Sequence, residues 1–350
     1  MIKVKISLGW WKPLGGLNAY SNDLPIFNFT NTNNNIYNNK HYYINSEIED
    51  PDFWFIIENT RKTKLEKVNI SNSRIFFLNS ETRYDDRYFF KSSSDKFLKQ
   101  FDFVYSPYDM KVKVYNTTPF LLWRLRGDPF EDIFEESDVK FYKNFNPQKE
   151  KLLSVYCTDK VETETQKLRL EFVKKLKILF GNDIDWFGYD IKTKNKQEGI
   201  AKYKYHLVLE NQLKNNFISE KLFDSFLGNS YPIYAGAPNV NDYFSKNSIT
   251  NINLHDFDES INKIENCINS ELYRKNFSYI EESKNVVLNK FNLIKRIDSI
   301  VENYLTKIDL NSEKNTKIIY PKIYFESKSF TQRIIYALKK RKNYLTKIFK

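Results

Sequence analysis

The sequence predicts an α/β protein made of two domains, the second of which contains a parallel sheet. A chain of 350 residues is longer than one ordinary domain needs and is long enough for two separate cores. Residues 145–150, FNPQKE, are polar and typical of a linker. Beyond them, strand-like and helix-like segments alternate at the spacing of βαβ units, which form parallel sheets covered by helices.

The first half of the chain contains apolar segments with polar spacers, which favours an α/β domain over residues 1–147. Its opening residues alternate in polarity, as expected of a strand. Residues 31–39 are rich in Asn and are expected to form a loop. Strands are predicted at Ile2–Ile6, Phe53–Ile57, Ile75–Leu78 and Phe101–Tyr105.

The second domain, residues 148–307, shows clearer periodicity and ends in a long helical region. Strands are predicted at Leu152–Tyr156, Asp185–Phe187, Tyr205–Leu209 and Tyr231–Ala235, and helices at Thr165–Phe180, Ser219–Leu227 and from Asp256 to Lys307. Apolar residues at helical spacing are expected to face the core. They are Leu168, Phe172, Leu176 and Leu179 in the first helix, and Ile261, Ile264 and Ile268 in the last region.

The net charge of +11 is concentrated at the end of the chain. Residues 327–350 hold eight basic residues and no acidic one, which leaves +3 for the rest, so nucleic acid is not an expected partner. Apolar residues recur among these basic residues at roughly helical spacing, which predicts a basic amphipathic helix on an anionic membrane surface. A final helix packed on the body of the protein is the alternative. The apolar residues are Phe330, Ile334, Leu338, Leu345, Ile348 and Phe349.

Cysteine content and hydropathy favour a cytoplasmic protein, peripheral on the inner face of the membrane if the basic helix binds there. Cys157 and Cys267 are too few and too far apart in sequence for a disulfide framework or a thiolate metal site. The first residues lack the apolar core of a secretory signal, and no run of about 18 apolar residues is present.

No tightly bound metal or cofactor is expected. The histidines His41, His206 and His255 show no ligand spacing. Residues 183–185 have the form of a DxD metal motif, but this short pattern often arises by chance, and here it is expected to cap or end a strand.

A candidate anion site lies in residues 210–221, ENQLKNNFISEK, between a predicted strand and a predicted helix. Ligands of open parallel sheets bind beyond the carboxyl ends of the strands. The helix start near Ser219 offers free N–H groups, and Lys221 adds a positive charge, so a diphosphate would fit there. Equally, Ser219 is an ordinary N-cap and Lys221 an ordinary solvated charge. No GxGxxG or Walker-type loop is present, and these residues alone leave both interpretations open.

Residues 203–244 resemble the donor-binding signature of the α-1,3/4-fucosyltransferases, glycosyltransferase family 10. The resemblance comprises a YKxxLxxEN strand end, an SEK helix start seven residues later, a D-x-F helix face and a P-I-Y-x-G-x-P strand and turn. Weaker similarity extends over about residues 1–300. It includes the segments 2–11, 76–82, 152–176 and 254–257.

The resemblance implies a GT-B fold, in which two Rossmann-like domains face each other across a cleft, with C-terminal helices. Residues 1–147 would bind the acceptor, residues 148–307 would bind GDP-fucose, and residues 308–350 would form a C-terminal extension. The implied reaction inverts the anomeric centre and moves L-fucose to a glycan, of N-acetyllactosamine or lipopolysaccharide type. Another GDP-sugar is an alternative donor. A non-enzymatic binder of anionic surfaces or nucleic acid through the tail is an alternative of another class.

Individual residues match the family's site residues by position. Arg169 matches a donor-binding arginine through the spacing R-x-x-F-x-x-x-L, and Lys221 matches a lysine that meets the diphosphate. Glu220 matches a glutamate near the fucose. Asn211 matches a residue on the nucleotide side. Phe217 stands where many members carry tyrosine, so a phenolic hydrogen bond would be lost.

The acceptor side rests on one residue. Glu81, in the segment 78–82, resembles the glutamate that serves the family as catalytic base, since it follows a predicted strand at the carboxyl edge. Asp85 and Asp86 lie close to it in sequence.

Overall fold

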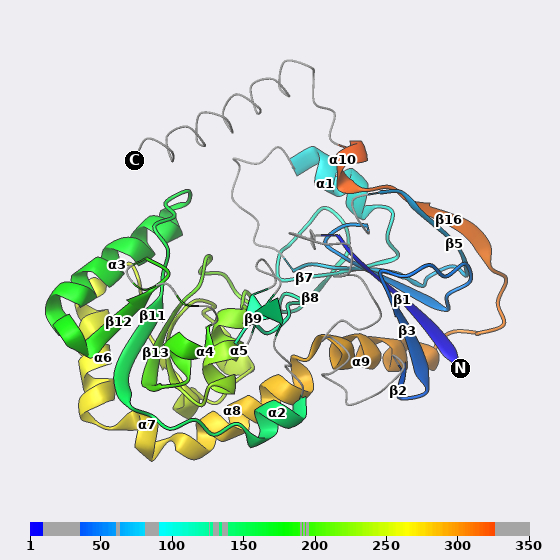
Figure 1. The fold of residues 1–350 in the computed structure, drawn as a ribbon. Helices are drawn as coiled ribbons and strands as arrows, with labels where there is room; N and C mark the ends of the chain where they lie inside the picture. Colours follow the sequence, from blue (N-terminus) through cyan, green and yellow to red (C-terminus); the bar gives the residue numbers. More distant parts are fainter. Residues whose placement is uncertain are drawn as a thin grey trace.

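The computed structural model describes residues 1–9, 36–60, 64–80, 91–125, 127–128, 133–134, 139–189, 191, 193 and 196–325. Each half of the chain is built on its own sheet, parallel throughout or nearly so, with helices packed against it (Figure 1). The mixed α/β class expected for a GT-B protein is confirmed.

The first sheet has the order β2-β3-β1-β4-β6-β7-β8, and every neighbouring pair is parallel except β2 with β3. Strands β4 and β6 are buried throughout because apolar residues occupy both of their faces. The strands are β1 (Ile2–Leu8), β2 (Ile36–Tyr37), β3 (Lys40–Ile44), β4 (Phe53–Ile57), β6 (Ile75–Leu78), β7 (Phe103–Ser106) and β8 (Val114–Asn116). The predictions for β4 and β6 are confirmed, and β7 begins two residues later than predicted.

The second sheet is parallel throughout, with the order β12-β11-β13-β14-β15. Its strands are β11 (Lys151–Tyr156), β12 (Ile184–Phe187), β13 (Tyr203–Leu209), β14 (Tyr231–Ala235) and β15 (Thr250–Asn251). Its helices are α3 (Glu164–Phe180), α4 (Gln197–Ile200), α5 (Glu220–Leu227), α6 (Phe257–Asn269), α7 (Leu272–Lys275) and α8 (Phe277–Lys290). The predicted βαβ unit is therefore present as β13, α5 and β14.

The remaining elements are short. Helix α1 (Lys91–Leu98) precedes β7, the pair β9 (Gly127–Asp128) and β10 (Ile133–Phe134) is antiparallel, and α2 (Val139–Asn144) precedes the linker. Gly181–Asp183, Val240–Asp242 and Lys246–Ser248 are single 3₁₀ turns.

The predicted apolar face of α3 is wrong at Leu179, which is 56% exposed. Phe172 and Leu176 are buried as expected, together with Arg169 and Val173. Positions 169, 172, 173 and 176 follow the i, i+3, i+4, i+7 pattern of one helix face, and Leu179 lies at its margin.

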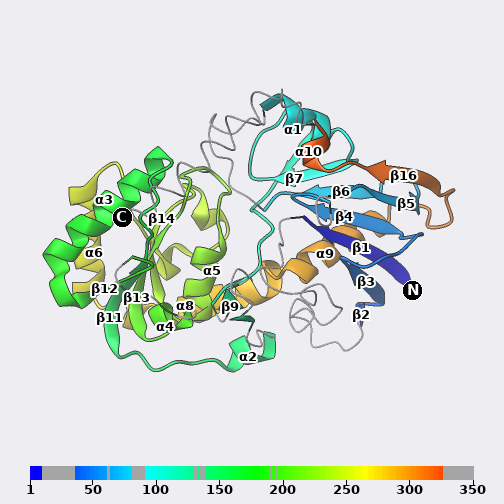
Figure 2. The ribbon, with the colours of Figure 1, turned by 45° about the horizontal axis from the view of Figure 1, so that its top comes forward.

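The chain returns to the first sheet after α8. Helix α9 (Leu293–Leu305) runs beside β3 in both views (Figures 1 and 2). The ring of Tyr304 packs 5.1 Å from that of Phe76, and Asp298 accepts a 2.8 Å hydrogen bond from the hydroxyl of Tyr42. Next, β16 (Asn315–Ile319) pairs antiparallel with β5 (Glu66–Ile70), and α10 (Lys322–Phe325) follows.

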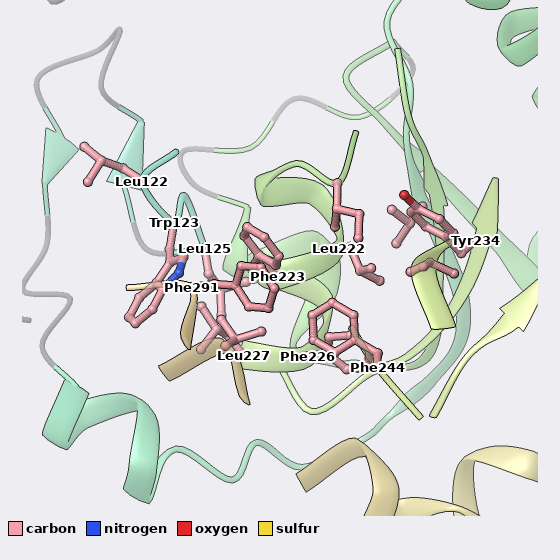
Figure 3. Close-up of a cluster of buried hydrophobic side chains, with 14 of the residues drawn as sticks. Leu122, Trp123, Leu125, Leu222, Phe223, Phe226, Leu227, Tyr234, Phe244 and Phe291 are labelled. Carbon is pink, nitrogen blue, oxygen red and sulfur yellow. The ribbon is translucent and has the colours of Figure 1, made fainter. Parts of the chain in front are cut away.

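Helix α5 is held by an apolar cluster that joins the two halves (Figure 3). Seven of its eight residues are buried, so its position is set by packing rather than by helix propensity. Its Phe223 stacks on Phe291 at 4.8 Å, and its Phe226 lies 4.9 Å from Phe244. The side chains of Leu122, Trp123 and Leu125, from the first half, lie in the same close-up.

Candidate active site

A buried carboxylate fixes the start of α5 at the carboxyl edge of the second sheet. Glu210 follows β13 directly and is fully buried. Its Oε1 accepts the backbone N–H of Ser219 at 2.7 Å, and its Oε2 accepts the Ser219 hydroxyl at the same distance. Ser219 is the N-cap of α5, as predicted. Burial raises the pKa of Glu210 even though Lys221 Nζ lies 3.8 Å from it.

The loop between β13 and α5 is locked to the turn after β14. Asn216 has φ of +65° and donates its backbone N–H to Asn239 Oδ1 at 2.7 Å. Its own side-chain oxygen accepts the hydroxyl of Tyr243 at 2.6 Å. These bonds hold a left-handed residue in place, so the loop presents the start of α5 in one conformation.

Gly236, in the turn after β14, allows the backbone to pass close to Glu210. A Cβ here would lie 2.2 Å from the Tyr234 ring and 2.7 Å from Glu210 Cγ. We expect Gly236→Ala to lower the free energy of unfolding by about 1–3 kcal/mol through overpacking and, given the donor-binding role that the resemblance implies for this edge of the sheet, to weaken GDP binding. Urea unfolding and titration calorimetry measure the two effects. Gly181→Ala is the control, since nothing lies near that position and its φ of +53° gives strain without affecting the site; equal loss of GDP binding in both variants would contradict the prediction.

Glu220, the first residue of α5, lies between two ammonium groups. Its Oε1 is 3.3 Å from Lys221 Nζ and 3.5 Å from Lys196 Nζ. Burial alone would raise the pKa of Glu220, but the charges of Lys221, Lys196 and Arg124 lower it well below its usual range. Glu220 is therefore an ionised carboxylate at neutral pH, in a site with little exposure to water.

Asp224, one turn further along α5, connects this cluster to the first half of the chain. It is fully buried, lies 3.0 Å from Lys196 Nζ and accepts the backbone N–H of Arg124 at 2.8 Å. Lys196 and Arg124 were not predicted from the sequence. Neither belongs to a periodic segment, and no spacing relates them to α5, so only the folded arrangement reveals them.

Arg169 and Asn211, two of the predicted donor-binding residues, lie side by side. The Arg169 guanidinium donates a hydrogen bond to the side-chain oxygen of Asn211. Arg169 is only 6% exposed, and its Nε has no hydrogen-bond partner among the residues that the structure describes. A buried guanidinium N–H gains free energy from a hydrogen bond, and an anionic ligand is one group that could accept it.

Phe217 is buried between the two halves. It is 2% exposed, and its ring stacks on that of Tyr108 with centroids 6.2 Å apart. The ring therefore packs against a residue of the first half.

The DxD residues and the histidines lie in other surroundings. Asp185 accepts hydrogen bonds from Lys151 at 2.7 Å and Tyr203 at 2.6 Å near the amino end of the second sheet, opposite the edge that holds Glu210. His206 is buried, its Nδ1 lies 2.8 Å from the Ser154 hydroxyl, and burial lowers its pKa to about 3. His41 stacks on a neighbouring tyrosine, and His255 is exposed. The described part of the chain holds no group of three His, Cys, Asp or Glu residues arranged for a metal ion.

Several predicted features lie outside the described residues. They are Glu81 with Asp85 and Asp86, most of the Asn-rich stretch, and the basic segment 327–350. Within the described part, none of the helices has both the length and the apolar character needed to cross a membrane.

Comparison with known proteins relates the second half of the chain to one family. Residues 146–312 match the model of the glycosyltransferase family 10 (fucosyltransferase) C-terminal domain. Eighty residues, 22% of the chain, are 38% identical to the alpha-(1,3)-fucosyltransferase FucT of Helicobacter pylori, and this match spans 16% of that protein.

Solved structures are similar to this chain at lower sequence identity. A crystal structure of alpha1,3-fucosyltransferase with GDP-fucose is 17% identical with a TM-score of 0.44, covering 79% of this chain and 81% of that one. The Anabaena protein Alr3699/HepE in complex with UDP is 9% identical with a TM-score of 0.46, covering 88% and 100%. The part of the chain that holds the site, residues 146–312, is therefore similar to the C-terminal domain of glycosyltransferase family 10 (fucosyltransferase).

Proposed function

We propose that the protein transfers L-fucose from GDP-fucose, with inversion, to a hydroxyl of a glycan that contains N-acetylglucosamine. Residues 148–307 bind the donor in this proposal, and residues 1–147 bind the acceptor. The observation that carries it is the arrangement at the start of α5, where an ionised Glu220 lies beside Lys221 and Lys196 at the carboxyl edge of a parallel sheet.

The diphosphate is the part of the donor that this edge fits best. The positive end of the α5 helix dipole and the ammonium of Lys221 offer positive charge. Arg169 would supply a further cation, and Asn211, which accepts a hydrogen bond from it, would contact the donor on the nucleotide side. As GDP departs, negative charge grows on the diphosphate, and cations already in place stabilise that charge without reorganising.

The sugar ring carries the opposite charge in the transition state. An acceptor hydroxyl attacks C1 of the fucose while the C1–O bond to the diphosphate breaks, and the ring gains oxocarbenium character. Glu220, held ionised, would favour that positive charge and orient the sugar hydroxyls. Glu81 would take the proton of the attacking hydroxyl. This chemistry needs no tightly bound cofactor.

The acceptor and the cellular location are proposed from the sequence. Lipopolysaccharide glycans lie at membrane surfaces, and the basic segment 327–350 suits an anionic surface on the cytoplasmic side.

A panel of nucleotide sugars tests the proposal. GDP-fucose, GDP-mannose and UDP-glucose are each supplied with and without N-acetyllactosamine, and nucleotide release and labelled product are measured. Release and transfer with GDP-fucose alone support the proposal. Turnover of GDP-mannose only would establish the alternative of another GDP-sugar, and no turnover of any donor would refute both.

A further inference from the structure

The two lysines that flank Glu220 approach it from different elements. Lys221, on α5 itself, places its Nζ 3.3 Å from Glu220 Oε1 and 3.1 Å from the Ser219 hydroxyl. Lys196 comes from the segment before α4, and its Nζ lies 3.5 Å from the same oxygen of Glu220 and 3.0 Å from Asp224 Oδ2. Since residues four apart share one face of a helix, Lys196 bridges the two carboxylates of that face.

Asp224 holds Lys196 in place. The side chain of Asp224 is fully buried, and its other oxygen accepts the backbone N–H of Arg124 at 2.8 Å. A carboxylate buried to this extent needs its cation, because a buried charge without a partner is strongly unfavourable. Lys196 is therefore fixed by a group that itself cannot move to water.

The element that carries Lys196 is fixed as well. Lys196 immediately precedes α4, whose Gly199 passes so close to Tyr156 that a Cβ would lie 2.7 Å from the ring. Tyr156 is the last residue of β11, and Ile200 at the end of α4 is buried. The Lys196 ammonium is thus supplied by a turn packed directly on the sheet.

Lys221 is held more loosely than Lys196. The fully buried carboxylate nearest to it is Glu210, whose Oε2 lies 3.8 Å from Lys221 Nζ. Both oxygens of Glu210 already accept hydrogen bonds from Ser219 at 2.7 Å. Lys221 can therefore turn toward another anion without leaving Glu210 unsatisfied.

Donor binding makes this difference important. In the proposed function the diphosphate lies at the start of α5 and attracts Lys221, so it adds negative charge near Glu220 and takes up part of the charge of one cation. Lys196 stays with Asp224 and remains beside Glu220. Among the described residues, the charged groups that act on Glu220 are Lys221, Lys196, Arg124, Glu210 and Asp224.

We propose that Lys196 is a positioning residue for transfer, which keeps a cation beside Glu220 after Lys221 has turned toward the diphosphate. The inference rests on the proposed function, in which Glu220 favours the positive charge of the sugar ring. It gives the two lysines separate parts: Lys221 binds the leaving group, and Lys196 preserves the charge of the carboxylate that faces the sugar.

The experiment measures kcat for transfer from GDP-fucose to N-acetyllactosamine, from about pH 5 to about pH 9, in the parent protein and Lys196→Met. The pH dependence of kcat reports groups in the donor complex, and the ratio of variant to parent cancels the groups common to both. Burial raises the pKa of Glu220, and losing a cation at this distance raises it by about one to two further units. The ratio should therefore fall about 3- to 10-fold between about pH 8 and about pH 5, as Glu220 takes up a proton.

Lys314→Met is the matched control. Lys314 Nζ lies 2.9 Å from Asp52 Oδ1, and the Lys314 side chain is 25% exposed, against 26% for Lys196. Lys314 directly precedes β16 on the first half, away from α5. The ratio for this variant should not change with pH.

A ratio for Lys196→Met that is as flat as that of Lys314→Met would overturn the inference, because Glu220 would then keep its charge without Lys196. If Lys196→Met melts below the assay temperature, the double variant Lys196→Met/Asp224→Asn replaces it, since the amide oxygen still accepts the Arg124 N–H and no buried charge is left. Its ratio should also fall toward low pH, and a flat ratio would again overturn the inference. A parent protein that turns over no GDP-sugar refutes the proposed function, whereas an active parent with a flat ratio refutes the inference alone.

Discussion

Replacing Lys221 with methionine is expected to lower kcat/KM for GDP-fucose about 100- to 1,000-fold, the loss typical of removing one group that stabilises transition-state charge. Lys221 Nζ lies within 4 Å of Glu210 and Glu220, and 3.1 Å from the Ser219 hydroxyl at the start of α5. The lysine can therefore turn toward a diphosphate placed at that helix start. Steady-state kinetics with GDP-fucose measure the loss, and calorimetry with GDP measures how much of it is ground-state binding.

Lys151→Met is the matched control for this prediction. Lys151 also pairs with a carboxylate on the second sheet, 2.7 Å from Asp185 Oδ2, but it begins β11 and so lies at the opposite edge from α5. Its removal should leave kcat/KM within about twofold, because an exposed pair of this kind contributes little to stability. Comparable losses in both variants would mean that the start of α5 has no special part in donor binding.

Replacing Glu81 with glutamine is expected to abolish transfer while leaving the affinity for GDP nearly unchanged. The amide cannot accept the proton of the attacking hydroxyl, whereas the proposed nucleotide contacts lie in the other half of the chain. Product formation and GDP calorimetry measure the two properties.

Asp85→Asn and Asp86→Asn are compared with Glu81→Gln, because both aspartates lie close to Glu81 in sequence and are alternative candidates for the base. Full activity in Glu81→Gln, with loss in one of these two, would move the base to that aspartate. Full activity in all three would exclude this segment from proton transfer.

The second sheet and its candidate site were largely predictable because they are local in sequence. Strand β13, the N-cap Ser219 and strand β14 lie within about 30 residues, and each has its own pattern of apolar spacing or capping. Arg169 and Asn211 were each predicted as donor-binding residues from separate matches to the family, and only the fold shows that they form a hydrogen bond. Only the fold, however, shows that Glu210 is the buried residue holding Ser219.

Long-range contacts could not be predicted in this way. Lys196 reaches Asp224 and Glu220 from a segment without periodicity. Strand β16 is short and partly exposed, and its partner β5 lies about 250 residues earlier, so no local pattern connects them. The prediction that Leu179 of α3 faces the core was wrong for a related reason. Helical spacing alone does not show where the sheet beneath the helix ends.

The return of α9 to the first sheet has a consequence for biosynthesis. Lys40 is 1% exposed, and its ammonium is neutralised by Asp298, 2.8 Å away, with Glu302 beside it. A nascent chain that has emerged only as far as the linker lacks both carboxylates, along with the Tyr304 ring that covers Phe76. We therefore expect the N-terminal half to stay incompletely folded during synthesis until α9 has been made, with apolar surface open to chaperones in that interval.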